Sequence, residues 1–251
     1  MNVLVIPDVH LKPYIFDKAD TILNNYNCDK VVLLGDFVDD WFQSNNIGLY
    51  NKTFDRLIKF LQEYDCLVCW GNHDLSYVWN KHDAGFSYIA QLTVIDRIRE
   101  VTKLLNGTYS QPNDYDRAAI IHRIDNVVFS HGGLTNEFVK NHIDTIAEEN
   151  NKQIQDVNID DIINSVNHYG KITLSEDNSP IWARPIYHNS NTIYTDDIAK
   201  FQVVGHTPVK KPRITETCVL CDDFSTNERA KPYGCNHFVI IDTQSLHIEV
   251  I

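Results

Sequence analysis

The sequence has no apolar stretch long enough to cross a bilayer and no positively charged segment at its start. Its longest apolar runs have the length of a β-strand, whereas a membrane-spanning helix needs about 20 apolar residues. Met1 is followed at once by the apolar residues 3–6, without the basic region or cleavage site of a secretion signal. We therefore expect no membrane partner and a cytosolic protein.

Positive charge is scarce in the chain. Lysine and arginine number 22 against 34 aspartates and glutamates, which gives a formal net charge of −12. This balance argues against a general electrostatic affinity for nucleic acid or for anionic membranes. It does not exclude a phosphorylated substrate, because bound metal ions can reverse the local sign of the charge.

The cysteine pattern does not indicate a zinc ribbon. Two Cys-x-x-Cys pairs are present, Cys66 with Cys69 and Cys218 with Cys221, but each pair lies in an apolar run typical of a strand. Residues three apart on a strand point to opposite faces and cannot share a metal ion. We expect the six cysteines to be reduced thiols buried in the core.

What the sequence does contain is an alternation of strand and helix patterns. Helical spacing of Phe54, Leu57, Ile58 and Leu61 places one apolar stripe on a helix over residues 52–64. Together with the apolar runs it predicts a β-α-β-α-β order, which is typical of a parallel sheet. The predicted segments are strands at 2–7, 30–34 and 66–70 and helices at 15–25 and 52–64.

The rest of the chain predicts further helices and a second sheet. We expect residues 1–251 to form one domain, with helical cap segments at about 75–116 and 134–180. Strands are predicted at 118–124 and 127–130, joined by a hairpin turn at Asp125-Asn126, and at 201–204. Residues 238–251 are predicted to form a terminal hairpin that closes the second sheet.

Polar, ligand-bearing residues follow the predicted strands where each strand ends. Open α/β sheets bind their ligands at this carboxyl edge. Carboxylates crowded together there repel one another and resist burial, so a cation between them is the usual solution. The segments are Asp8-Val-His10, Gly35-Asp36-Phe-Val-Asp39-Asp40, Gly71-Asn72-His73-Asp74, Ser130-His131-Gly-Gly and Gly205-His206-Thr-Pro.

A set of rings between the third and fourth of these segments is open to two interpretations. Tyr77, Trp79, His82, Phe86 and Tyr88 could line the rim of a site. The favoured interpretation is that they pack a helical cap onto the sheet, because aromatic residues dominate core area in most domains.

These motifs, in this order, resemble the calcineurin-like metallophosphoesterase superfamily. Within it, His131-Gly-Gly, Trp182-x-Arg184 and Gly205-His206-Thr-Pro are most similar to the phosphoprotein phosphatase branch, which includes bacterial and phage Ser/Thr phosphatases and diadenosine tetraphosphate hydrolases. The resemblance implies an α/β (α+β) fold, a four-layer sandwich of two mixed β-sheets flanked by helices.

The resemblance also implies two divalent metal ions, with manganese the first choice and iron or zinc as alternatives. Such ions, roughly 3.5–4 Å apart, share a hydroxide and hold it in line with a phosphorus atom. Asp36 corresponds to the ligand that bridges both ions. Asp8 and His10 correspond to ligands of the first ion, and Asn72, His131 and His206 to ligands of the second.

Three further roles come from the same resemblance. His73 corresponds to the acid that protonates the leaving oxygen, and Asp39 to the carboxylate that orients and charges it. Arg184 corresponds to the arginine that binds phosphate oxygens with a bidentate fork, and Asn72 is expected to bind substrate as well as metal.

The expected activity is hydrolysis of a phosphomonoester: a phosphoprotein, a nucleotide or another small phosphoester. The alternative is a phosphodiesterase or dinucleoside polyphosphate hydrolase that acts on nucleotides or nucleic-acid ends. A catalytically inactive scaffold is a third hypothesis, and retention of every ligand position counts against it.

One position departs from the family pattern. The phosphatase branch has an arginine and a glycine directly after the aspartate that matches Asp39, and this chain has Asp40 and Trp41 there. A cation that helps to hold phosphate is thus replaced by a carboxylate. The change weakens the case for a protein phosphatase, makes a less charged diester more plausible, and leaves metal binding untouched.

Overall fold

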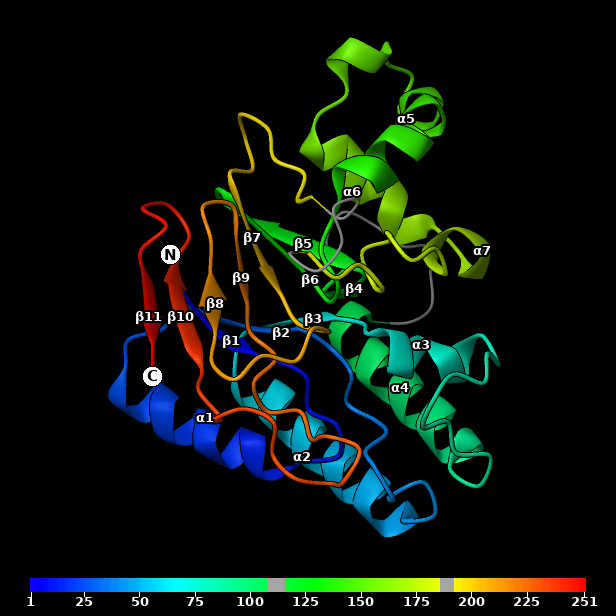
Figure 1. Ribbon diagram of the computed structural model, residues 1–251, viewed down its shortest axis with the longest axis vertical. Helices are drawn as coiled ribbons and strands as arrows, with labels where there is room; N and C mark the ends of the chain where they lie inside the picture. The colour runs from blue at the N-terminus through cyan, green and yellow to red at the C-terminus, as the bar shows by residue number, and fades with distance from the viewer. Residues whose placement is uncertain (108–115, 186–191) are drawn as a thin grey trace.

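A computed structural model describes residues 1–107, 116–185 and 192–251, and its strands form two mixed sheets (Figure 1). In the first sheet the four strands from β1 to β4 run parallel, and β10 pairs antiparallel with β1 and with β11. Its spatial order is β11 (Ile248–Val250), β10 (Val239–Asp242), β1 (Asn2–Ile6), β2 (Lys30–Leu33), β3 (Cys66–Cys69) and β4 (Ala118–Ala119).

The second sheet has a parallel centre and antiparallel edges. Strands β6, β7 and β9 run parallel, while β5 and β8 are antiparallel to their neighbours. The order is β5 (Ile121–Ile124), β6 (Val127–Ser130), β7 (Phe201–Val204), β9 (Cys218–Leu220) and β8 (Arg213–Ile214).

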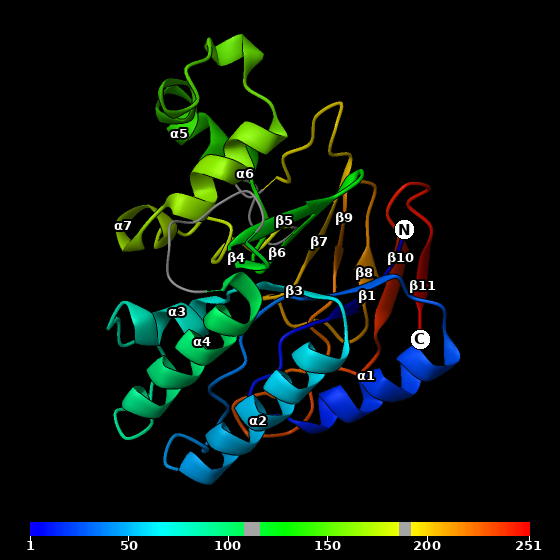
Figure 2. The same ribbon diagram turned by 180° about the vertical axis from the view of Figure 1, so that it is seen from behind.

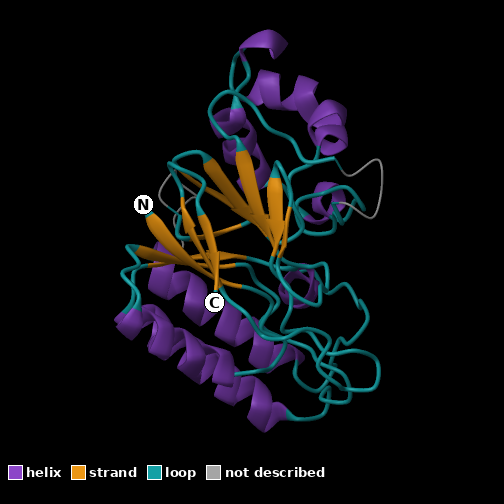
Figure 3. Ribbon diagram, turned by 60° about the vertical axis from the view of Figure 1, so that its left-hand side comes forward, coloured by secondary structure: helices purple, strands orange, loops and turns teal. Residues whose placement is uncertain are grey.

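Helices cover the outer sides of the two sheets, as seen from behind in Figure 2 and from the side in Figure 3. The first sheet is flanked by α1 (Tyr14–Asn25), α2 (Ile47–Glu63) and α4 (Gln91–Asn106), and α3 (Asn72–Val78) follows β3. The second sheet carries α5 (Asn136–Glu149), η1 (Ile154–Asp156), α6 (Ile159–His168) and α7 (Lys171–Leu174). The predicted α/β sandwich of two mixed sheets flanked by helices is confirmed.

Strand β1 shows why the central apolar runs are continuous rather than alternating. Val3 and Val5 pack between the two sheets, in one cluster with Phe129. Leu4 and Ile6 belong to the cluster on the helix side. Both faces of the strand are therefore buried, which requires apolar residues at every position.

Two strand predictions need correction. The apolar run at 118–124 is two strands in different sheets, because the chain turns at Ile120, where the Asn167 side chain accepts from the backbone N–H groups of Ile120 and Ile121. The terminal hairpin joins the first sheet, with Ile241 opposite Val3, rather than closing the second. This pairing satisfies the backbone groups on the open side of β1.

The cysteines follow the strand argument but not all are in the core. Cys66 packs on the helix side and Cys69 between the sheets, so that pair cannot share a metal ion. All six are free thiols, and burial is confirmed for Cys66, Cys69, Cys218 and Cys221. The prediction is wrong for Cys28, which is half-buried, and for the exposed Cys235, because both lie in loops outside the strands.

The first predicted helical segment, 75–116, overlaps the end of α3 and contains α4, while its residues 108–115 lie outside the described residues. The second, 134–180, contains α5 to α7. The assignment of the whole chain to one domain stays a prediction. Among the described helices, none combines the length and the apolar character needed to cross a membrane.

Candidate metal centre

The loops that follow five strands meet where the carboxyl ends of the two sheets come together. Strands β1, β2 and β3 are neighbours in the first sheet, and β6 and β7 are neighbours in the second. Their ends therefore deliver side chains from distant parts of the sequence to one place. The six predicted metal ligands lie there: Asp8, His10, Asp36, Asn72, His131 and His206.

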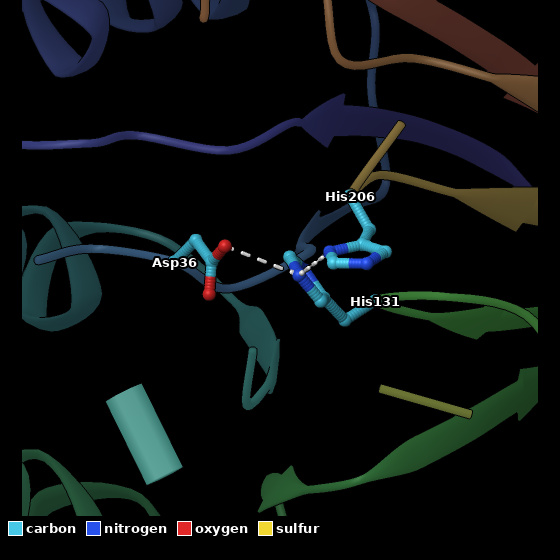
Figure 4. A group of neighbouring side chains, drawn as sticks. All are labelled: Asp36, His131 and His206. Carbon is cyan, nitrogen blue, oxygen red and sulfur yellow. Dashed lines mark hydrogen bonds and ion pairs between the residues drawn. The ribbon is translucent and has the colours of Figure 1, made fainter. Parts of the chain in front are cut away.

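Two groups of donor atoms share Asp36. Its carboxylate lies within 4.8 Å of donor atoms of His131 and His206, and a second group within the same limit consists of Asp8, His10 and Asp36. Figure 4 shows His131 between Asp36 and His206, with its Nε2 3.2 Å from Asp36 Oδ2 and 3.1 Å from His206 Nδ1. Asn72 Oδ1 is 3.0 Å from the same Nε2.

For two of the three histidine rings, a hydrogen bond on the far side sets which nitrogen faces the centre. His131 Nδ1 donates to the carbonyl oxygen of Leu34 at 2.8 Å, and His10 Nδ1 donates to that of Asp39 at 2.8 Å. Since a carbonyl can only accept, both Nδ1 atoms carry hydrogen and both Nε2 atoms are left as lone-pair donors when the rings are neutral.

The chemistry of this donor set fits a divalent cation. Carboxylate oxygens, an amide oxygen and imidazole nitrogens converge within hydrogen-bond distance, and they offer lone pairs far in excess of protons. A buried cluster of lone pairs is unfavourable unless a positive ion lies among them. Oxygen and nitrogen donors without thiolate suit Mn²⁺, Fe or Zn²⁺.

The ionisation of the buried groups shows the same need for positive charge. Burial, reinforced by the nearby Asp222, raises the pKa of Asp8 well above its usual value. Burial would also raise the pKa of Asp36, but the charges of His131 and His73 outweigh it and hold that pKa low. Burial opposes the charge on His131, yet Asp36 and Asp8 raise its pKa to about 10. In the metal-free protein His131 thus supplies the positive charge.

Several predicted site residues have strained backbones. Among non-glycine residues, positive φ angles occur at His10 (43°), Asp36 (48°), Asp39 (58°) and His206 (57°). This region is uncommon for such residues and costs free energy, and it clusters at functional sites. The strained turns aim the side chains at the centre directly after the strands end.

Two glycines are required by close approach to the ligands. A Cβ at Gly71 would lie 2.1 Å from Asp36 Oδ1, and a Cβ at Gly205 would lie 2.2 Å from Asp8 Oδ1. Both glycines belong to the motifs that the sequence singled out, Gly71-Asn72-His73 and Gly205-His206.

His73 and Asp39 form a pair beside the ligands. His73 Nδ1 is 3.1 Å from Asp39 Oδ2, and the hydroxyls of Tyr50 and Tyr77 donate to Asp39 Oδ1 at 2.8 and 2.6 Å. Burial alone would lower the pKa of His73, but the charge of Asp36 and the bond to Asp39 raise it to about 9. His73 is therefore positively charged at neutral pH.

A cavity of about 430 Å³ opens over this centre. Arg184 lines it, and its Nη1 donates to the carbonyl oxygen of His206 at 2.7 Å. Other lining residues include His10, Asp36, Asp39, Asp40, Trp41, Phe42, Asn72, His73, Asp83, Trp182, His206, Asp222 and Thr226. Every predicted catalytic and substrate-binding residue thus faces the same space.

Sequence reasoning missed some residues around the site. Lys12 is buried, and its Nζ lies 3.0 Å from Asp40 Oδ2. Tyr77, for which packing of the cap was the favoured of two interpretations, holds Asp39 through its hydroxyl. Asp222 is buried in the cavity wall. The available signal was the position of Lys12, two residues after His10 and close to the acidic loop. A buried lysine needs an acidic partner, and that loop offers one.

Comparison with known proteins supports a relationship across most of the chain. The family described as calcineurin-like phosphoesterase matches residues 1–210. No curated protein matches the sequence. Solved structures that resemble the fold include a protein serine/threonine phosphatase from Saccharomyces cerevisiae, with 12% identity and a TM-score of 0.56 over 100% of this chain and 79% of that one. Another is a cold-active protein-tyrosine phosphatase of a psychrophilic Shewanella, with 16% identity and a TM-score of 0.50 over 99% and 80%.

Proposed function

Because the chain belongs to the calcineurin-like phosphoesterase family, we propose that it hydrolyses a phosphomonoester with the help of two divalent metal ions. The observation that carries this proposal is the convergence of lone-pair donors around His131 Nε2 and Asp36. Asp36 would be shared between the ions. Asp8 and His10 would complete one site, and Asn72, His131 and His206 the other.

Bound divalent cations would supply Lewis acidity, which lowers the pKa of water and offsets the charge of a phosphate. We propose manganese, which suits a set of oxygen and imidazole donors. The chain fixes those donors before any ion arrives, because the carbonyls of Leu34 and Asp39 orient the rings of His131 and His10.

His73 is proposed as the group that protonates the leaving oxygen. Its Nδ1 is engaged by Asp39, and its elevated pKa of about 9 keeps the ring protonated at neutral pH, so Nε2 carries the proton to be donated. Arg184, held by the His206 carbonyl, retains further N–H groups for phosphate oxygens. Asn72 is proposed to contribute its amide to substrate binding.

A second candidate is favoured by one observation, the aspartate at position 40. Its carboxylate pairs with Lys12. The positive charge of that lysine is therefore not free to bind a phosphate dianion. A phosphodiester or dinucleoside polyphosphate carries less charge at each phosphorus and has less need of that cation. Both candidates use the same ligands and the same acid.

The ratio of two hydrolysis rates separates the candidates. The protein is stripped with a chelator, reloaded with Mn²⁺ and assayed on p-nitrophenyl phosphate and on bis-p-nitrophenyl phosphate. We expect metal-dependent turnover with the monoester faster. A faster diester rate would favour the second candidate, and failure to hydrolyse either compound would reject the enzyme proposal.

The role of His73 is tested by replacing it with alanine. His73→Ala should keep the metal content of the unmodified protein and lose most turnover, because the residue is proposed to act on the leaving group and not on the ions. His168→Ala is the matched control, since that histidine is at the end of α6 and does not line the cavity. Loss of bound metal in His73→Ala would refute the assignment as acid.

A further inference from the structure

Two large aromatic side chains stand exposed at the cavity, directly after Asp40. Trp41 and Phe42 both line it, yet 49% and 79% of their surface is accessible to solvent. Phe42 also has a φ of 63°, which is unfavourable for a bulky residue. Aromatic rings normally gain stability by burial, so exposure and backbone strain together need an explanation.

Trp41 is held in place although it is exposed. Its Nε1 donates to the carbonyl oxygen of Thr226 at 3.1 Å, and its backbone N–H donates to Asp40 Oδ1 at 2.8 Å. Asp40 is in turn fixed by Lys12 at 3.0 Å and accepts from the hydroxyl of Thr226. A ring positioned in advance loses little conformational entropy when a ligand covers it.

The other tryptophan that lines the cavity, Trp182, already contacts a cation and a second ring. Lys81 Nζ lies 4.5 Å from the centre of the Trp182 ring, and the Trp182 and His206 rings are nearly perpendicular with centroids 5.7 Å apart. Within the described part of the chain, no cation or aromatic ring stacks on Trp41 or Phe42. Among the described lining residues, Trp41 and Phe42 are therefore the large aromatic side chains without such a contact.

Charge around the cavity suits a single phosphate. Arg184 is the one lysine or arginine among the described lining residues. Lys12 and Lys81 lie nearby, but each is paired, with Asp40 at 3.0 Å and with Asp83 at 3.4 Å. A second phosphate on the substrate would meet these carboxylates without a free cation to balance it.

We propose that Trp41 and Phe42 form a stacking platform for a planar, uncharged ring on the leaving group, so that the preferred substrate is a phosphomonoester bearing one phosphate and a nucleobase-like ring. Asp40 and Thr226 are positioning residues that hold the platform against the cavity. The inference rests on the proposed phosphomonoesterase activity and specifies its substrate class.

The test compares two phosphomonoesters of ribose, one with a nucleobase and one without. Adenosine 5′-monophosphate and ribose 5-phosphate release the same kind of primary alcohol, but only the first carries a base. With the Mn²⁺-loaded protein we expect kcat/KM to favour the nucleotide by roughly 5- to 150-fold, the range given by base–aromatic stacking. Adenosine 3′,5′-bisphosphate should be a poorer substrate than the monophosphate, because its second phosphate finds no free cation.

Variants locate the effect. Trp41→Leu and Phe42→Leu should each lower the preference for the nucleotide, mainly through KM, while Trp41→Phe should retain most of it because a ring remains. Asp40→Asn should also raise KM for the nucleotide, with a smaller effect on kcat. Leu92→Ala is the control: Leu92 is an apolar residue of α4, 76% exposed, that does not line the cavity, and its replacement should leave the preference unchanged.

The failure of this inference differs from the failure of the proposed function. Hydrolysis of p-nitrophenyl phosphate without any preference for the nucleotide over ribose 5-phosphate would overturn the platform and leave the phosphomonoesterase proposal standing. A preference that survives Trp41→Leu and Phe42→Leu would also overturn it. Absence of hydrolysis on every phosphomonoester would overturn the proposed function, and the platform with it.

Discussion

Replacing Asp39 with asparagine should disable the proposed acid without disturbing the metal ligands. Asp39 Oδ1 accepts from Tyr50 and Tyr77, and Oδ2 faces His73 Nδ1 at 3.1 Å. An asparagine oxygen can keep both tyrosine bonds, which turns its NH₂ group toward His73. Two donors then face each other when the imidazole is protonated, so the charged form of His73 loses its partner.

The size of the effect follows from the charge on that hydrogen bond. A bond to a charged group is worth roughly 1.5–3 kcal/mol, which corresponds to about a 10- to 150-fold fall in kcat at pH 7–8. The same energy lowers the pKa of His73 from about 9 by roughly 1–2 units, since one unit is about 1.4 kcal/mol. Because an acid works only while protonated, the alkaline loss of activity should begin at a correspondingly lower pH.

The assay is kcat against pH from 6 to 10 on the Mn²⁺-loaded Asp39→Asn protein, with metal content measured on the same samples. Asp83→Asn is the matched control, because Asp83 lines the same cavity but pairs with Lys81 rather than His73. The reasoning is refuted if Asp39→Asn keeps kcat within about threefold and an unshifted alkaline limb. Loss of metal from this variant would refute it as well.

Three other predictions concern metal binding and stability. Metal affinity should rise with pH from 7 to 10, because His131 must be neutral to bind an ion and its pKa is about 10 in the metal-free protein. Competition with a chelator measures the affinity at each pH, and an affinity that does not change with pH would contradict the prediction. Gly71→Ala should lose metal, because its Cβ would lie 2.1 Å from Asp36 Oδ1. Gly170→Ala is the control and should keep its metal, because the added Cβ meets nothing within 4 Å. Equal metal content in the two variants would contradict the prediction. Burial lowers the pKa of His122 to about 4, so the unfolded chain binds this proton more readily, and the free energy of unfolding should fall by about 3 kcal/mol as pH drops from 6.5 to 4. Urea unfolding of the unmodified protein and of His122→Gln tests this, and identical pH dependence in the two would contradict it.

The sequence was informative wherever function depends on the ends of strands. The apolar runs at 30–34 and 66–70 locate β2 and β3 within one residue, and the polar residues that follow them must then lie at one edge of a parallel sheet. The order of the elements and the period of the pattern are therefore enough to predict that Asp36 and Asn72 lie in the same region.

Contacts between side chains far apart in the chain could not be predicted in this way. The bond from Tyr77 to Asp39 joins residues 38 positions apart, and the bond from Thr226 to Asp40 joins residues 186 apart. Such pairs depend on how loops fold over the strand ends. The terminal hairpin pairs with the first sheet, contrary to the prediction, for the same reason: its alternating pattern predicts a strand but not which neighbour it pairs with.

Asp40 shows how contacts between distant residues change the expected function. From sequence, a carboxylate in place of the family's arginine suggests repulsion of the phosphate. In the structure its charge is offset by Lys12, 3.0 Å away, and its other oxygen accepts from Thr226 and from the backbone of Trp41. A paired carboxylate exerts a much weaker field than a free one, because the opposite charge lies closer to it than any substrate can. On the proposed function, the substitution removes a cation that the family pattern places near phosphate and supplies the bonds that fix Trp41, so that recognition would pass from the charge of the phosphate to the ring of the leaving group.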